Sequence, residues 1–256
     1  MLNVMSLNCN YCCDKHGPWD ERLKLIRSLI LENRPHVAAF QAVLHQKAGP
    51  LGEIGQAWQI ADITGYRYRL FASAHQEDNG DRKGQALISR IPLVFSDSRQ
   101  LTRRPGHADQ DKRIVLAAQV ETKAGTLRIF NVHFSWIREQ AEDNIIETLN
   151  FLRRFKGMAL VVGDFNASEN SGLLDSFAES GWVDVWNILR KNERGFTFES
   201  HEPCLRIDYA LANKSLEQHL EDIRVFQRQT PDGLFRMSDH LALMVTLGLP
   251  LKGPGC

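Results

Sequence analysis

An unbroken apolar run from Met158 to Val162 stops abruptly at the tetrapeptide "GDFN". The run is short and β-branched, which is typical of a strand that is buried on both faces. Asp164 and Asn166 then lie at the exit of this strand, a place where layered folds often carry catalytic groups. The same two residues also suit a turn that caps a helix starting near Ser168, and the stretch alone does not decide between these interpretations.

The rest of the chain alternates between short strands and single helices. Apolar residues at helical spacing predict helices from Asp20 to Pro35, from Arg138 to Phe155 and around Leu173–Ala178. Strands are predicted at "NVMSLNCN", "HVAAFQAV", "YRYRLFAS", "GQALIS", "LVFSDSRQL", "RIVLAAQVE", "LRIFNVHFS", "LRIDYAL", "EDIRVFQ" and "LALMVTLGL". No element is predicted in the Gly-rich and polar stretch that precedes "YRYRLFAS". Because strands outnumber helices, we expect two sheets packed together with helices outside.

Length and charge favour one neutral domain. The 256 residues are 43% hydrophobic and show no repeat or linker, so we predict a single domain over residues 1–256. A formal net charge of zero argues against a protein that grips duplex nucleic acid mainly through its phosphates. No signal peptide and no membrane-spanning segment can be recognised, which predicts a cytoplasmic protein.

The cysteines point to a reducing environment. There are five, an odd number, which fits a reduced intracellular protein. Cys9, Cys12 and His16 could be considered as zinc ligands. We do not favour that site, because no second CxxC pair exists and Cys9 lies in a predicted strand.

Polar residues suited to chemistry gather at or near the predicted strand ends. They are Asn8, Asn10, His133, Asp164, Asn166, Asp208, Asp239 and His240. Each has an ordinary structural explanation: an amide can satisfy buried backbone, Asp208 can pair with Arg206, and a histidine can be hydrogen-bonded in the core. Together they supply carboxylates, amides and imidazoles that suit a hard divalent cation and a phosphate.

Seven segments resemble, in order, the endonuclease/exonuclease/phosphatase superfamily, and "GDFN", "RIDY" and "SDH" are the most specific. The segments are "SLNCN", "FQAV", "GQALISRIPL", "NVHFS", "VVGDFNAS", "RIDYAL" and "SDHLALMVTL", from about residue 3 to residue 247. The resemblance implies an α/β fold, a four-layered α/β/β/α sandwich with two packed mixed β-sheets flanked by helices and a site at one rim. It also implies hydrolysis of a phosphate ester with Mg²⁺, for which Mn²⁺ could substitute.

The resemblance also implies catalytic roles. Asp164 matches the residue that orients or deprotonates the attacking water, and Asn166 matches the amide that binds the phosphoryl oxygens. His240 matches the imidazole at the scissile phosphate, and Asp208 the acid that orients this imidazole. His133 matches a phosphate-contacting histidine.

Further matches concern the metal and the phosphate. Asp239 matches a metal-side acid, and Asn8 the asparagine that braces the metal ligand. Arg113 occupies the place where some relatives hold the phosphate with arginine, and Asn10 is a second candidate for phosphate binding.

The family's principal metal-binding carboxylate is missing. In the family the second strand usually ends in Gln-Glu, whereas this chain has Gln41 and then Ala42. Magnesium commonly relies on one or two carboxylates, so this loss should weaken Mg²⁺ binding greatly. Neither the uncharged Asn10, at a position where some relatives carry an acid, nor Gln41, which should point to the opposite face, can replace the carboxylate.

Three explanations for Ala42 remain open. The chain is an engineered variant of an active enzyme, a natural pseudo-enzyme that binds without turnover, or an enzyme in which another acid serves. The intact motif residues favour the engineered variant. The candidate substitute acids are Glu169, Asp78, Asp81 and Asp109.

The substrate is expected to be a phosphate ester, whether a small molecule, a lipid head group or a nucleic acid, bound by a monomer. Neutral overall charge favours a small phosphodiester or phosphomonoester. The alternatives are a DNA or RNA nuclease and a non-catalytic protein that binds phosphate ligands. A basic loop could grip a nucleic-acid backbone or simply be solvated; it contains Arg103, Arg104, His107, Lys112 and Arg113.

Overall fold

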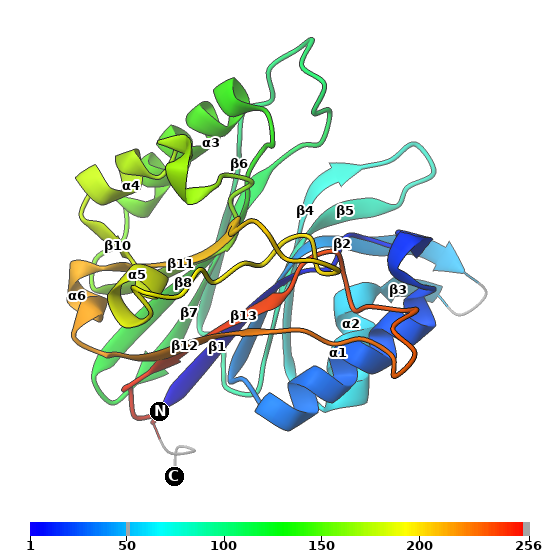
Figure 1. Ribbon diagram of the computed structural model, residues 1–256, viewed down its shortest axis with the longest axis horizontal. Helices are drawn as coiled ribbons and strands as arrows, with labels where there is room; N and C mark the ends of the chain where they lie inside the picture. Colours follow the sequence, from blue (N-terminus) through cyan, green and yellow to red (C-terminus); the bar gives the residue numbers. More distant parts are fainter. Residues whose placement is uncertain (50–51, 253–256) are drawn as a thin grey trace.

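The computed structural model describes residues 1–49 and 52–252, and the strands of this part form two mixed sheets packed face to face (Figure 1). Sheet A has seven strands, in the order β12 (Leu220–Phe226), β13 (Ala242–Leu247), β1 (Leu2–Asn8), β2 (Val37–Gly49), β5 (Arg82–Ser89) and β4 (Tyr68–Gln76), with β3 (Gly52–Gly55) paired to β2. Sheet B has six, in the order β10 (Trp182–Asp184), β11 (Asp208–Asn213), β9 (Met158–Asp164), β8 (Gly125–His133), β7 (Ile114–Thr122) and β6 (Phe95–Gln100).

Strands β1 and β9 are apolar on both faces, and alternate residues enter different cores. In β9, Leu160 and Val162 pack between the two sheets, whereas Val161 packs under the helices of sheet B. In β1, Val4 faces the space between the sheets and Met5 faces the helices of sheet A. This period of two fixes which side chains of each strand point into the junction between the sheets.

Helices cover the outer face of each sheet. α1 (Trp19–Asn33) and α2 (Gln56–Thr64) pack on sheet A, and α3 (Arg138–Leu152) and α4 (Asp175–Glu179) pack on sheet B (Figure 1). Two shorter helices, α5 (Val185–Leu189) and α6 (Lys214–Glu217), contribute side chains to the core between the sheets. The predicted α/β/β/α sandwich is therefore confirmed.

Several sequence predictions differ from the observed elements. α2 lies in the stretch where no element was predicted. The helix is short and follows a Gly-rich segment, so the helical spacing of its buried residues Ala57, Ile60 and Ala61 was not recognised. The strand expected from Leu205 begins only at Asp208. In the described ranges, no helix combines the length and the apolar character that crossing a membrane requires.

A bulge interrupts β2 at the position of the missing glutamate. Phe40 pairs with Ala86 and Val43 with Gly84, so two residues of β2, Gln41 and Ala42, oppose one residue of β5. Ala42 has a φ of +48°, a left-handed conformation that is unfavourable for alanine.

A buried amide from sheet B bridges the two sheets beside this bulge. The Asn131 side chain donates from Nδ2 to the carbonyls of Phe40 (2.9 Å) and Ala86 (3.1 Å). Its Oδ1 accepts from Nε2 of Gln41 at 2.6 Å. Asn131 is fully buried, so these bonds are made without competition from solvent.

Replacement of Asn131 by alanine should therefore lower the free energy of unfolding by about 2–4 kcal/mol, because it removes the hydrogen bonds of its buried partners in sheet A, Phe40, Gln41 and Ala86. Urea denaturation would measure this loss. The exposed Asn150 is the matched control, and Asn150→Ala should change the stability by less than about 0.5 kcal/mol. Equal effects of the two substitutions would contradict the bridging role.

Candidate active site

Strand register brings most of the predicted site residues to one rim of the sandwich. His133, Asp164 and Asp208 are consecutive register partners across β8, β9 and β11. Each shares its strand parity with residues that pack between the sheets, as Asn8 does at the end of β1. All four side chains therefore point into the junction between the sheets, where the apolar core ends.

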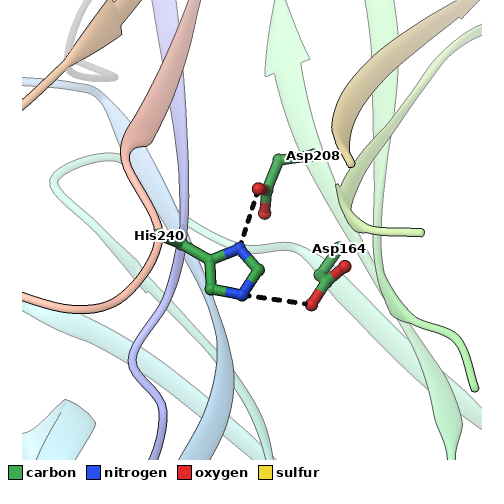
Figure 2. A group of neighbouring side chains, drawn as sticks. All are labelled: Asp164, Asp208 and His240. Carbon is green, nitrogen blue, oxygen red and sulfur yellow. Dashed lines mark hydrogen bonds and ion pairs between the residues drawn. The ribbon is translucent and has the colours of Figure 1, made fainter. Parts of the chain in front are cut away.

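The centre of the site is one imidazole between two carboxylates (Figure 2). His240, two residues before the start of β13, has Nδ1 2.8 Å from Oδ2 of Asp208 and Nε2 3.6 Å from Oδ2 of Asp164. The side chains of all three residues are at most 6% exposed. The acids belong to sheet B and the imidazole to the segment leading into sheet A, so this array links the two sheets.

Electrostatics favour an imidazolium at His240. Burial lowers its pKa, but the attraction of Asp208 and Asp164 outweighs burial and raises it to about 10. Burial raises the pKa of Asp164 to about 6 against the opposing charge of His240. At neutral pH the array thus holds two negative charges and one positive charge.

Two further side chains contact Asp164. Asn8 donates from Nδ2 to Oδ2 of Asp164 at 2.8 Å, and His133 places Nε2 3.4 Å from the same oxygen. Burial lowers the pKa of His133 well below its usual value, and the positive charges of Arg113 and His240 act in the same direction. A neutral His133 can donate one hydrogen bond to a ligand or to Asp164.

The "GDFN" turn is built by Asp164 itself. Its Oδ1 accepts from the backbone N–H of Asn166 at 2.8 Å, and Asn166 adopts a φ of +50°, which asparagine tolerates well. Asn166 also donates from Nδ2 to the carbonyl of Phe134 at 2.9 Å. The short turn Glu169–Ser171 (η2) that follows has no side-chain cap, so Asp164 and Asn166 build their own turn and do not cap a helix.

A buried arginine holds the loop after β1. Arg22 of α1 is fully buried and donates to the backbone carbonyls of Cys9, Tyr11, Cys13 and Met237. It therefore fixes the segment that carries Asn8 and Asn10 against the segment that leads to Asp239 and His240.

Asp239 lies beside this loop and is partly exposed. Asn10 donates from Nδ2 to Oδ2 of Asp239 at 2.7 Å, and the hydroxyl oxygen of Ser238 lies 3.0 Å from Oδ1. The imidazole of His16 lies 4.0 Å from the same carboxylate. Ala42 is adjacent to the same loop after β1, since its carbonyl accepts from the backbone N–H of Tyr11 at 2.7 Å.

Arg113 lies at the edge of the site and is already paired. It forms an ion pair with the buried Asp109 at 2.9 Å. It also lines a small pocket together with His133, Tyr11, Lys112 and others. A phosphate at this pocket would share the guanidinium with Asp109.

Of the substitute acids named from the sequence, Glu169, Asp109 and Asp81 bond to other parts of the protein and Asp78 is exposed. Glu169 pairs with Arg206 at 2.9 Å, and Arg206 also pairs with Asp184, whereas Asp208 bonds to His240. Asp109 pairs with Arg113, Asp81 accepts from the backbone N–H of Lys47, and Asp78 is exposed.

Two arginines of the basic loop are already bonded to other side chains of the protein. Arg104 makes a two-point contact with Asp143 of α3, and Arg103 bonds to Gln110 within the loop.

The zinc candidates from the sequence do not meet. Cys9 belongs to the core under α1, and burial raises the pKa of its thiol to about 12. Cys9, Cys12, Cys13 and Cys204 are free thiols, and Cys256 lies outside the described residues. Among described His, Cys, Asp and Glu residues, the group of three or more with metal-ligand spacing is Asp164, Asp208 and His240. We assign it as an ion array because both nitrogens of the charged His240 face carboxylates.

Sequence reasoning missed several supporting residues. Thr197 accepts from the backbone N–H of Asp208 at 3.2 Å, and the ring of Phe198 lies 5.0 Å from that of His240. Ser238 donates from its hydroxyl to the carbonyl of Asn8 at 2.6 Å. No pattern in "FTFES" distinguishes Thr197 and Phe198 from ordinary loop residues, whereas Ser238 begins the "SDH" motif, in which the resemblance implied roles for Asp239 and His240 alone.

Comparisons with known proteins show the family and the fold of this chain. The profile of the Endonuclease/Exonuclease/phosphatase family matches residues 5–240. Among curated protein sequences, none matched. A family protein from Leptotrichia buccalis is 18% identical, with a TM-score of 0.77 over 96% of this chain and 99% of that chain. A family protein from Beutenbergia cavernae is 20% identical, with a TM-score of 0.78 over 97% of this chain and 72% of that chain. A mannosyl-6-phosphatase from Bacteroides thetaiotaomicron is 19% identical, with a TM-score of 0.73 over 96% of this chain and 99% of that chain. At such identities the likeness to these structures establishes the fold alone.

The charge assignment predicts that His240 stays protonated at pH 8, where a free imidazole with a pKa of about 6.5 is neutral. Side-chain ¹⁵N NMR would measure this. Asp208→Asn should lower the pKa of His240, because it removes the strongest attraction that raises it, whereas Asp62→Asn on the surface should not. Deprotonation of His240 near pH 6.5 in the unaltered protein would contradict the assignment.

Proposed function

This chain belongs to the endonuclease/exonuclease/phosphatase family, and from that premise we propose that it hydrolyses phosphate esters by in-line attack of a water molecule that Asp164 orients. The observation that carries the proposal is the buried Asp164–His240–Asp208 array at the rim of the two sheets. A phosphoesterase needs an oriented water and donors around the phosphoryl oxygens, and the side chains at this rim supply both.

In this proposal Asp164 receives the proton of the attacking water. With a pKa of about 6, it is ionised at neutral pH yet basic enough to accept a proton in the transition state. The amide of Asn8 fixes its Oδ2, and the backbone N–H of Asn166 fixes its Oδ1. A carboxylate held at both oxygens directs its remaining lone pairs toward one water position.

The developing charge on the phosphate would be met by His240 and by neutral donors. His240 approaches as an imidazolium that Asp208 orients through Nδ1. Asn166 keeps a second N–H of its amide after donating to Phe134, and the neutral His133 offers one N–H. These donors match the roles that the sequence resemblance implied.

A divalent cation beside Asp239 would complete the site. Such an ion neutralises negative charge on the phosphoryl oxygens. Asp239 and the amide of Asn10 are the oxygen donors that would hold it, while Asn8 braces the turn between them. Mg²⁺ usually binds through one or two carboxylates and substrate phosphates. With Ala42 in place of the family's glutamate, the set suits Mg²⁺ weakly, so we propose that Mg²⁺-supported turnover is reduced in this chain and that Mn²⁺ could substitute.

A small phosphodiester or phosphomonoester is the proposed substrate class. The net charge of the chain is zero, and two arginines of the basic loop are held by Asp143 and Gln110. Few cations therefore remain to follow a nucleic-acid backbone, which needs many phosphate contacts.

Hydrolysis of nucleic-acid, nucleotide, inositol-phosphate and phospholipid substrates by the unaltered chain and by Ala42→Glu tests the proposal. We expect one small ester to be preferred. We also expect Ala42→Glu to turn it over at least ~10-fold faster at low Mg²⁺, because the restored carboxylate strengthens metal binding.

Asp164→Asn in each background is the control for contamination, and it should remove most turnover while melting at a similar temperature. Absence of turnover in both forms, with retained binding of phosphate ligands, would overturn the enzyme and favour a binding protein.

A further inference from the structure

His16 is a buried polar group that the proposed reaction does not use. It ends the 3₁₀ turn Asp14–His16 (η1), and its side chain is 1% exposed. Among the described residues, neither ring nitrogen has a hydrogen-bond partner. Burial of an unpaired imidazole costs free energy, so native proteins rarely leave both nitrogens without a partner.

The nearest charged group to His16 is the carboxylate of Asp239. Nε2 of His16 lies 4.0 Å from Oδ2 of Asp239. This separation is too long for a hydrogen bond, whose limit is about 3.2 Å, but it is just below the sum of two metal–ligand bonds of about 2.1 Å each. A single ion placed between the two atoms would therefore contact both.

The surroundings of this pair suit a cation. The side chain of Asp239 is 19% exposed, so an ion can enter from that side although His16 is covered. Besides the two nitrogens of His16, the buried Oε1 of Glu199 also lacks a hydrogen-bond partner within the described ranges. Its neighbour Ser200 donates a backbone N–H to the carbonyl of Asp239 at 2.7 Å, so Glu199 belongs to the segment bordering the pair.

We propose that His16 and Asp239 together bind a divalent transition-metal ion, of the class represented by Zn²⁺, in preference to Mg²⁺. The inference rests on the proposed function in that it names the metal class for the same site. Imidazole suits zinc and related transition ions, whereas magnesium prefers oxygen donors. The neutral nitrogen of His16 thus takes over part of the role that the carboxylate at position 42 has lost.

Titration calorimetry of the substrate-free protein with Zn²⁺ and with Mg²⁺ tests this inference. Loss of a ligand should cost at least the ~10-fold in affinity that loss of an outer-sphere partner costs. His16→Gln and Asp239→Asn should therefore each weaken Zn²⁺ binding by ~10-fold or more. His16→Gln should leave Mg²⁺ binding nearly unchanged. His219→Gln, far along the chain and partly exposed, is the matched control and should bind Zn²⁺ as the unaltered protein does.

A second measurement does not depend on a variant that folds. Zn²⁺ added to the unaltered protein should shift the ¹⁵N resonance of Nε2 of His16 in NMR spectra, because this nitrogen would become a ligand. Unchanged His16 resonances, or equal Zn²⁺ affinity in His16→Gln, would overturn the inference and leave a water molecule as the bridge. Both readouts measure Zn²⁺ binding without substrate. A protein that hydrolyses phosphate esters but does not bind Zn²⁺ at His16 would overturn this inference alone, and a protein that binds Zn²⁺ at His16 but hydrolyses no phosphate ester would overturn the proposed function alone.

Discussion

Two carboxylates share one imidazolium at the rim of the sandwich, and the rest of the site depends on this arrangement. Loss of the His240 cation would leave two buried carboxylates without a counter-charge, which is costly. His240, on the segment that leads into sheet A, is held by two acids of sheet B, Asp208 and Asp164. The array keeps one net negative charge, which would repel a phosphate. In the proposed function, a cation beside Asp239 would offset this repulsion.

The alternation of apolar residues explains why this site could be predicted in outline. The parity that buries Leu160 and Val162 between the sheets also aims Asp164 inward, and the same rule places His133 and Asp208. The sequence indicated the strand ends but not the register, which depends on pairing between distant segments. It could not reveal His16 beside Asp239, because that contact arises from the fold of a loop held by Arg22.

The metal side of the site retains its scaffold although one ligand is gone. Ala42 still occupies a bulge and keeps a left-handed backbone, which alanine adopts at a cost of about 1–2 kcal/mol. Arg22 still holds the loop of Asn10 against the segment of Asp239. In the proposed metal site, alanine at position 42 supplies no donor, and the proposed nitrogen donor is His16.

The pH dependence of kcat/KM for the best phosphate ester tests the central claim most directly, since the claim is that Asp164 and His240 act as a coupled pair held by Asp208. The account predicts an acidic limb near pH 6, where Asp164 protonates, and an alkaline limb where His240 loses its proton. Asp208→Asn should move both limbs to lower pH, because it removes an attraction from His240 and a repulsion from Asp164. Superimposable profiles for the two proteins would contradict the account.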